Sequence, residues 1–534
     1  MNLIFLVLVV VAYLVVTGIL GYLGFRSTKN STDYLLAGRR IHPMVMALSY
    51  GATFISTSAI IGFGGAAAVY GMGIVWLTFL NIMVGIFIAF VFFGRRTRKM
   101  GHNLDAHTFP ELLGKRYGSR FLQTAGGALI FCAMPLYAGS VIIGGVQFVS
   151  QTLKVQYEVA LLFFVAVVAL YVVMGGMKGV MYTDAFQGAL MFAGMAFLLC
   201  YTYYVLGGVG KAHQALTDLA PMAREAFGKA GHTGWTSMPV AFSPYWWQLV
   251  TTIVLGVGIG VLAQPQLTVR FMTVKSGHEL NRAVVVGGIF IAMMTGVAFT
   301  VGALSNVYFV NTVGKIALLA GDKKTDNIMP LFIDRAMPPW FVAFFFVTLL
   351  AAAMSTLSSQ FHAMGTAFGR DFLERGLNVR AKNSVAINRI AMGAGIILST
   401  LIAYALPRFY AGGTAIIATG TAIFFGLCAA AFLPLYVGAL YFRRASREAA
   451  IACFSAGVFV SLFWLFFVHA KEAVPLGLCK SLFGRPSLFP ALANVDPIVV
   501  ALPISTVVFI VVSLCTRPVP AEVADKAFRG VKTA

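Results

Sequence analysis

Four hydroxyl side chains lie close together in one apolar stretch of the second half of the chain. Residues 351–360 read Ala-Ala-Ala-Met-Ser-Thr-Leu-Ser-Ser-Gln, and the hydroxyls belong to Ser355, Thr356, Ser358 and Ser359. Hard cations are bound in proteins by oxygen ligands. A group of uncharged oxygens inside hydrocarbon therefore predicts a site for a small dehydrated cation.

Helix geometry places these hydroxyls on more than one face. At about 100° per residue, Ser359 lies within about 60° of Ser355. Thr356 and Ser358 lie on the two flanks, so Ser355 can serve two neighbouring sites. The alternative for a single hydroxyl is a bond back to the carbonyl four residues earlier, which is common in membrane helices. Four hydroxyls within five residues favour the cation site.

Asp184 is the only carboxylate that we place inside a predicted membrane span, near its inner end. A charged group there is costly and by default marks a functional site. We expect this carboxylate to meet the hydroxyl cluster around a sodium ion. The alternative is a buried acid that pairs with Lys178, although Lys178 can also extend its amine to the cytoplasmic interface.

The elements that position these residues are membrane helices. The chain has 534 residues, of which 59% are hydrophobic and 11% charged, and its mean hydropathy is +0.86. Apolar runs of about 20 residues can cross the hydrocarbon core of a bilayer. We therefore predict an all-α integral membrane protein. About thirteen spans are expected, at residues 3–24, 43–70, 74–94, 122–150, 159–177, 182–207, 246–264, 283–310, 338–366, 390–407, 411–442, 449–468 and 497–516.

The basic residues indicate the orientation of these spans. The net charge is +21, and the larger share of the 39 lysines and arginines falls on alternate loops, as the positive-inside rule describes for cytoplasmic loops. The first apolar run has no basic segment before it and no small-residue cleavage site after it, so we expect a span rather than a signal peptide. The N-terminus is then outside and the C-terminus cytoplasmic. The charge describes topology and does not indicate nucleic acid as a partner.

Other chemistries find no support in the pattern. The six cysteines include no CxxC pair, and neither a P-loop nor a nucleophile with an adjacent base stands out. We therefore predict no disulfide framework, no ATPase and no enzyme, and we find no sign of an obligate protein partner.

Two spans carry the signals of interrupted helices. Residues 51–71 combine several glycines with a polar run, and residues 255–265 combine alternating glycines with Gln264-Pro265. Broken helices at matching positions of two halves are typical of transporter sites near the bilayer midplane. The alternative is close helix packing through small residues. Because two such segments occur, we favour discontinuous helices.

The hydroxyl-bearing segment resembles the sodium-binding helix of the sodium:solute symporter family, which includes proline, sialic acid and sodium/glucose transporters. Four further segments resemble motifs of that family in the same order along the chain. They are Thr32 to Arg39, Thr108 to Gly118, Gly175 to Gln187 and Gln264 to Met272. Each segment alone is weak evidence, whereas together they are specific.

This resemblance implies the LeuT fold, in which two inverted repeats of five helices form one transporter domain. On this chain, a single domain over 1–534 would contain the repeats at about 43–207 and 246–442. One extra helix at about 3–24 would precede the repeats, and two extra helices at about 449–516 would follow them.

The resemblance also implies two sets of sodium ligands. The first consists of the backbone carbonyls of Ala52, Ile55 and Ala352 with the hydroxyls of Ser355 and Thr356. A second site, which only some members have, would use Asp184, Ser355, Ser358 and Ser359. Some members carry an aspartate where this chain has Phe54, so Asp184 would supply the only formal charge near two ions. We expect Na⁺ as the cofactor, one ion at the first site and two if the second site also binds.

The solute is expected to bind between the two interrupted helices. The candidate contact residues are Phe54, Ser56, Thr57, Tyr137, Val257, Gln264 and Thr419. Tyr137 resembles a tyrosine near the pocket of the proline transporter, whereas Val257 replaces that transporter's pocket tryptophan. No arginine or lysine is predicted near the midplane. An anionic solute would then be held by sodium, hydroxyls and helix N-termini.

We therefore expect a multi-pass transporter of the inner or plasma membrane that imports a small organic solute with sodium. A small carboxylate (a monocarboxylate, pantothenate or an amino acid) is favoured over a sugar, because the candidate pocket is apolar and poor in amides. The expected partners are this solute and the lipid bilayer. Two alternatives remain open: proton-coupled transport with Asp184 as the carrier, and a membrane sensor module, against which the short C-terminal tail argues.

Overall fold

The computed structural model describes residues 3–26, 31–39, 41–174, 177–379, 384–409 and 415–531. In this part of the chain the long elements are all helices, and the β pairing is an isolated bridge between Ile41 and Val274. Eleven of the described helices are long and apolar enough to cross a membrane. The prediction of an all-α membrane protein is therefore confirmed. Gly175 and Gly176, which open one of the predicted motifs, lie outside the described residues.

The eleven continuous helices and the thirteen predicted spans differ for local reasons. Helix α3 (Pro43–Phe54) is short and separate, and the residues after it form one long helical run, Ser58–Asn103. The span predicted at 159–177 corresponds to α9 (Tyr157–Met174), whose apolar stretch is described over Tyr157–Ala169. The structure therefore changes where the segment 43–103 is divided, and the apolar segments themselves lie where they were predicted.

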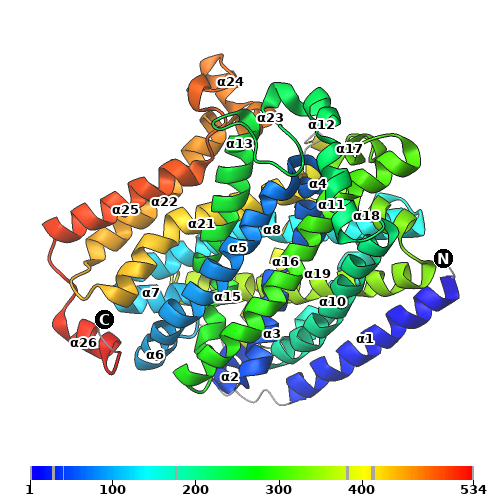
Figure 1. Ribbon diagram of the computed structural model, residues 1–534. Helices are drawn as coiled ribbons and strands as arrows, with labels where there is room; N and C mark the ends of the chain where they lie inside the picture. Colours follow the sequence, from blue (N-terminus) through cyan, green and yellow to red (C-terminus); the bar gives the residue numbers. More distant parts are fainter. Residues whose placement is uncertain are drawn as a thin grey trace.

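Helix α19 (Pro339–Thr366), which carries the hydroxyl cluster, forms the centre of the bundle (Figure 1). Together with its continuation η9 (Ala367–Glu374) it makes a 36-residue span whose most apolar window is 94% buried. It packs against α3, α8 (Arg120–Leu153) and α10 (Met177–Val205). The hydroxyls of the cluster consequently face protein rather than lipid.

The peripheral helices enclose this centre. Helix α1 (Leu3–Arg26) packs on α10 and α19 at one edge of the bundle, and α22 (Arg447–Phe467) and α25 (Pro497–Cys515) run side by side at the other (Figure 1). Helix α21 (Ile416–Tyr441) lies between α22 and the centre. The other long helical segments are α5 (Val75–Ile82) with η4 (Met83–Gly94), α16 (Gly277–Val313) and α20 (Ser384–Phe409).

Short helices cover the two ends of the bundle (Figure 1). At one end lie α11 (Val209–Asp218), α12 (Ala220–Phe227), α13 (Pro244–Trp246), α17 (Ala317–Ala320), α18 (Thr325–Ala336), α23 (Ala470–Leu476) and α24 (Leu478–Phe483). At the other lie α2 (Ser31–Leu36), α6 (Arg95–Asn103), α7 (Phe109–Tyr117) and α26 (Ala521–Phe528).

The first interrupted helix breaks directly after α3. Ile55 is extended, with φ −93° and ψ 112°, and the chain becomes helical again in η2 (Ser58–Phe63) and α4 (Gly64–Tyr70). The predicted interruption is thus confirmed, but it falls at Ile55 rather than at a glycine. The glycines serve packing instead: a Cβ at Gly65 would lie 2.3 Å from the Thr325 carbonyl oxygen. Both interpretations of this segment are therefore correct, at different residues.

The second interrupted helix breaks at Gln264, which is extended with φ −73° and ψ 118°. Its helical segments are η6 (Trp247–Val257), α14 (Gly258–Gly260), η7 (Val261–Ala263), α15 (Pro265–Thr268) and η8 (Val269–Met272). Pro265 explains the position of the break, because proline disfavours helical backbone in the preceding residue and itself suits the start of a helix. Gly260 again permits packing, since a Cβ there would lie 2.6 Å from the Phe425 carbonyl oxygen.

Two polar clusters hold the ends of the bundle. At the end with α18, the Asp326 carboxylate accepts hydrogen bonds from the backbone N–H groups of Ile416 and Ile417, at the N-terminus of α21. At the opposite end, buried Glu111 of α7 pairs with Arg370 of η9 at 3.1 Å and with Lys115 at 2.9 Å. Each cluster joins elements from distant parts of the sequence.

Asp371 is a second buried carboxylate of the bundle, which was not predicted. Helix α19 continues through η9 beyond its predicted end, and the fully buried Asp371 lies in this continuation. The Asp371 carboxylate accepts hydrogen bonds from Thr108 Oγ1 at 3.0 Å and from Gln123 Nε2 at 2.8 Å. The charged residues that follow residue 366 in the sequence concealed this continuation.

Candidate cation site

The hydroxyls of Ser355 and Thr356 face the carbonyl oxygens at the end of α3. Ser355 Oγ lies 2.9 Å from the Ala52 oxygen and 3.2 Å from the Ala352 oxygen. Thr356 Oγ1 lies 3.4 Å from the oxygens of Ala52 and Ile55. The five groups predicted for a first sodium site therefore converge, across the contact between α3 and α19.

The chemistry of these five groups suits a hard monovalent cation. All are oxygens, three from backbone carbonyls and two from hydroxyls. The residues that carry them are at most 1% exposed. The break at Ile55 frees the Ala52 and Ile55 carbonyls, because an uninterrupted helix would use them in its own hydrogen bonds. In the structure the Ser355 hydroxyl donates to the Ala52 carbonyl, and the Thr356 hydroxyl lies nearest to the Thr53 carbonyl, at 3.1 Å. Rotation of the two hydroxyls would turn their lone pairs toward a bound ion.

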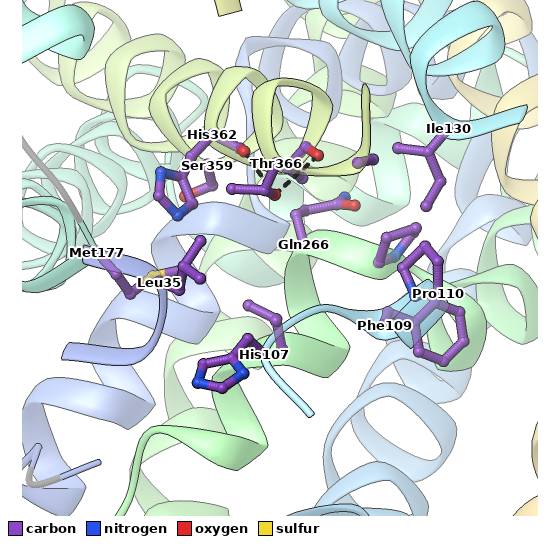
Figure 2. Close-up of a pocket in the computed structure, with 14 residues that line it drawn as sticks. Leu35, His107, Phe109, Pro110, Ile130, Met177, Gln266, Ser359, His362 and Thr366 are labelled. Carbon is purple, nitrogen blue, oxygen red and sulfur yellow. Dashed lines mark hydrogen bonds between the residues drawn. The ribbon is translucent and has the colours of Figure 1, made fainter. Parts of the chain in front are cut away.

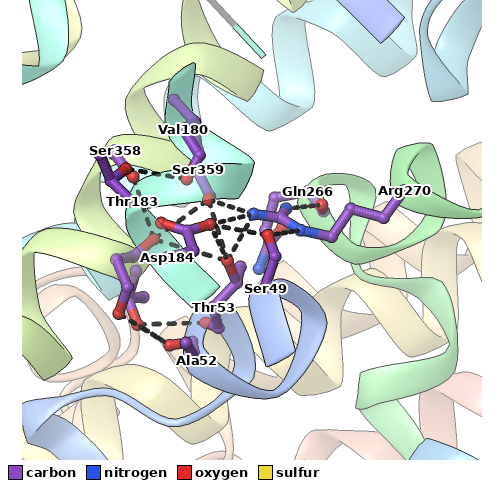
Figure 3. A network of polar contacts seen from close by, with 12 residues as sticks. Ser49, Ala52, Thr53, Val180, Thr183, Asp184, Gln266, Arg270, Ser358 and Ser359 are labelled. Carbon is purple, nitrogen blue, oxygen red and sulfur yellow. Dashed lines mark hydrogen bonds and ion pairs between the residues drawn. The ribbon is translucent and has the colours of Figure 1, made fainter. Parts of the chain in front are cut away.

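The predicted second set of ligands comes together only in part (Figure 3). Asp184 Oδ2 accepts hydrogen bonds from Ser49 Oγ at 2.9 Å and from Thr53 Oγ1 at 3.2 Å. Ser359 Oγ lies 3.0 Å from the same Thr53 hydroxyl, so Ser359 belongs to this network. The Ser358 hydroxyl instead donates to the Ser355 carbonyl at 3.1 Å, and the Ser355 hydroxyl is engaged at the first site.

Arg270 is a basic side chain beside Asp184 that the sequence did not predict. Its side chain is fully buried, and its Nη2 lies 2.7 Å from Asp184 Oδ2. The break at Gln264 redirects the short helices that follow, and Arg270 extends from them into the bundle. The alternative for Asp184, a buried ion pair, is therefore correct in kind, but in the described structure the pair is made with Arg270 rather than Lys178.

A cavity of about 20 Å³ lies between the two interrupted helices. Four of the predicted solute-contact residues line it: Phe54, Ser56, Tyr137 and Val257. Tyr137 and Ser56 are joined by a side-chain hydrogen bond. The cavity also touches Ile55, whose carbonyl belongs to the cation site, so one break in the chain serves both sites.

The other three predicted contact residues lie elsewhere. Thr57 Oγ1 donates to the Val141 carbonyl at 2.6 Å, and Gln264 Nε2 donates to the Gly260 carbonyl at 3.3 Å. Thr419 lines a separate apolar cavity of about 460 Å³, where Lys471 Nζ donates to it at 3.4 Å. Thr57 and Gln264 lie near the breaks and Thr419 lies in α21, but the contacts of all three side chains are made away from the central cavity.

Several polar residues of the cavity were not predicted. They are Ser58, Asn81, Thr295 and Thr421. Asn81 Oδ1 and Ser58 Oγ are buried, and neither has a hydrogen-bond partner among the described residues. The isolated amide of Asn81 in an apolar span was a signal that could have been used, because polar groups in membrane helices usually serve contacts or function.

A further small cavity, also of about 20 Å³, lies between α19 and the start of α7 (Figure 2). Ser359, His362 and Thr366 of α19 border it on one side, with Gln266 of α15 beside them and His107 from the segment before α7 opposite. His362 Nε2 and Gln266 Oε1 are buried and have no hydrogen-bond partner among the described residues. Ser359 therefore takes part in the Asp184 network and also borders this cavity.

Comparison with known proteins assigns the chain to a family. The profile of the sodium:solute symporter family matches residues 34–457. The sodium/pantothenate symporter of Haemophilus influenzae is 26% identical over 427 residues, which is 80% of this chain and 83% of that protein. The osmoregulated proline transporter OpuE of Bacillus subtilis is 26% identical over 522 residues, which is 97% of this chain and 96% of that protein.

Solved structures show the same fold. A Na⁺-coupled sialic acid symporter in a substrate-bound outward-open state superposes with a TM-score of 0.73 at 18% identity, over 97% of this chain and 98% of the other. The nucleobase-cation-symport transporter Mhp1, in a closed conformation, gives a TM-score of 0.50 at 14% identity, over 94% of this chain and 99% of the other. The chain therefore belongs to the sodium:solute symporter family and is a multi-pass transporter of the plasma membrane rather than an enzyme.

Proposed function

We propose that this transporter couples inward sodium movement to solute uptake through the five oxygens of the first site. One observation supports this most directly: the Ser355 and Thr356 hydroxyls of α19 face the Ala52 and Ile55 carbonyls of the broken first helix. A sodium ion bound there would link the two helices. Bound sodium would thereby favour the conformation in which α3 and α19 are in contact.

Coupling to the solute follows from the shared break. The carbonyl of Ile55 belongs to the ion site, and the same residue lines the central cavity. A sodium ion that fixes this backbone also fixes the cavity wall, and the solute then binds to a site that is already ordered. By linkage, the solute must tighten sodium binding by the same factor as sodium tightens solute binding.

The arrangement of the whole chain is part of the proposal. Thirteen membrane helices, an outside N-terminus and a cytoplasmic C-terminus fit the distribution of basic residues. Two inverted five-helix repeats at about 43–207 and 246–442 would place the two breaks, at Ile55 and Gln264, at equivalent positions of the first helix of each repeat. Transport then consists of movement of one group of helices against the other around these breaks.

The solute is proposed to be a small carboxylate. The cavity offers neutral polar groups, from Ser58, Asn81, Thr295 and Thr421 among others, and no charged side chain is among its described lining. Proline and pantothenate, after which two of the relatives are named, both carry a carboxylate. At about 20 Å³ the cavity has room for little more than a water molecule. Binding of a solute therefore requires the helices to separate.

Uptake into proteoliposomes tests this function. A panel of radiolabelled monocarboxylates, amino acids, pantothenate and sugars is offered under an inward sodium gradient, an equal potassium gradient and a pH gradient. We expect one carboxylate to accumulate with sodium alone. Accumulation that follows the pH gradient without sodium would assign coupling to Asp184 as a proton carrier, and accumulation of a sugar would overturn the solute class.

A further inference from the structure

Arg270 is a buried cation that the first sodium site does not use. It lies in η8, which follows α15 after the second break, and its side chain is fully enclosed. Its guanidinium donates to five oxygens. These are Ser49 Oγ (3.2 Å), Thr53 Oγ1 (2.5 Å), Asp184 Oδ2 (2.7 Å), the Gln266 carbonyl (2.7 Å) and Ser359 Oγ (2.6 Å).

Two of these oxygens belong to the predicted second sodium site. Asp184 and Ser359 both face the same guanidinium nitrogen, Nη2 (Figure 3). The remaining two predicted ligands are directed elsewhere, Ser355 to the first site and Ser358 to a carbonyl of its own helix. A positive charge is thus already present where the second ion would bind, and it comes from the chain itself.

The charge balance at Asp184 favours one cation at a time. The carboxylate and the guanidinium are both completely buried, so their charges cancel in a medium of low dielectric. A sodium ion could approach only through Asp184 Oδ1, which has no hydrogen-bond partner among the described residues. It would then share one carboxylate with Arg270, and two like charges at that separation repel strongly without water to screen them.

Resting on the sodium coupling proposed above, we propose that Arg270 is a tethered cation that replaces a second sodium ion at Asp184. The transporter then binds and carries a single sodium ion in each cycle. Arg270 also does structurally what an ion there would do, because it joins α3 through Thr53, α10 through Asp184 and α19 through Ser359. If the charge of Arg270 is removed, the Asp184 carboxylate becomes available to bind sodium.

Equilibrium binding of radioactive sodium to the purified full-length protein tests this without knowledge of the solute. Sodium bound per protein is measured to saturation for the wild type, Arg270→Gln, Arg270→Lys, Asp184→Asn and the double variant Arg270→Gln/Asp184→Asn. Thr356→Val identifies the first site in the same assay. Each variant is first checked for monodispersity by size-exclusion chromatography.

The expected result is one sodium ion per wild-type protein, lost in Thr356→Val and unchanged in number in Asp184→Asn. Arg270→Gln binds two ions, Arg270→Lys binds one, and the double variant returns to one. Two ions on the wild type, one of which disappears in Asp184→Asn, would overturn the proposal. A folded Arg270→Gln that still binds one ion would overturn it as well.

The two proposals fail differently in this assay. If the wild type binds no sodium, sodium coupling itself is wrong, whereas two ions on the wild type leave coupling intact and refute only the role of Arg270. If Arg270→Gln does not fold, the comparison between wild type and Asp184→Asn still decides, because the proposal requires the same count in both.

Discussion

The Ser355 hydroxyl lies 2.9 Å from the Ala52 carbonyl oxygen, although the two residues are 303 positions apart in the sequence. This contact joins the central helix α19 to the broken end of α3. Ala52 is available as an acceptor because the chain leaves the helical conformation at Ile55. The cation site therefore depends on the break and on the register of α19 together.

Asn81 is expected to contribute to solute affinity. Its side-chain oxygen is buried in the central cavity with no partner among the described residues, so a polar group of the solute can pair with it. Asn81→Leu should raise the half-saturating solute concentration about tenfold, because an unpaired polar group on a buried ligand costs about 1–3 kcal/mol. Thr400→Val is the control, since the Thr400 hydroxyl only bonds back to Ile396 of its own helix. Equal solute affinity in both variants would remove Asn81 from the site.

The ion pair between Glu111 and Arg370 is expected to hold α7 against the inner end of α19. Glu111→Gln should lower the free energy of unfolding by about 3 kcal/mol, because it leaves Arg370 without its buried partner. Asp105→Asn is the control. Its carboxylate pairs with Arg39 but is 78% exposed, so the change should cost less than about 1 kcal/mol. Thermal unfolding in detergent measures both, and equal losses would contradict the assignment.

The pH dependence of the same pair has a defined sign. Burial alone would raise the pKa of Glu111, but the hydrogen bond from His107 and the charge of Arg370 hold it well below its ordinary value. A lowered carboxyl pKa gives stability that is complete above the ordinary pKa and is lost only as the pH falls toward the lowered value. The difference between wild type and Glu111→Gln should therefore stay constant between about pH 6 and pH 8.

Asp326, at the other end of the bundle, is expected to make the stability of the protein depend on pH in the opposite direction. Burial raises its pKa to about 7, against the effect of the Ile417 and Ile416 N–H groups and of Lys471. Between its ordinary pKa and about 7 the folded protein holds a proton here that the unfolded chain releases, so stability rises as the pH falls through 7. Asp326→Asn should remove this component from the melting temperature, compared at pH 6 and pH 8. Asp322→Asn, in the preceding turn, should leave the pH dependence as in the wild type.

The meeting of the five oxygens of the proposed first site could be predicted from the sequence because its signals are local. The hydroxyls crowd into a few residues of one helix, and the family resemblance supplied the carbonyl partners. Four of the seven candidate contact residues line the central cavity for a similar reason, since Phe54, Ser56, Tyr137 and Val257 lie beside a break or in a recognised motif. The family and its transport function were likewise accessible from ordered motifs.

The features that could not be predicted depend on the direction that a helix takes after a break, or on where a helix really ends. Arg270 is close to other basic residues in the sequence, and only the redirected η8 brings it to Asp184. Asp371 is buried because α19 continues past its apolar stretch. Thr57 and Thr419 are close in sequence to residues that line the central cavity. Their positions around the helix axis, however, point their hydroxyls toward Val141 and Lys471. Periodicity alone does not fix such rotations.

The sodium dependence of uptake in Thr356→Val and Thr348→Val proteoliposomes tests the central claim most directly. Both residues are buried threonines of α19, and valine keeps the shape of each. The Thr356 hydroxyl faces the Ile55 and Ala52 carbonyls, whereas that of Thr348 only bonds back to Phe344. We predict that Thr356→Val raises the half-saturating sodium concentration about tenfold or more, equivalent to about 1.4 kcal/mol of lost binding, and that Thr348→Val leaves it unchanged. The same sodium dependence in both variants would contradict a coupling site at the break in α3.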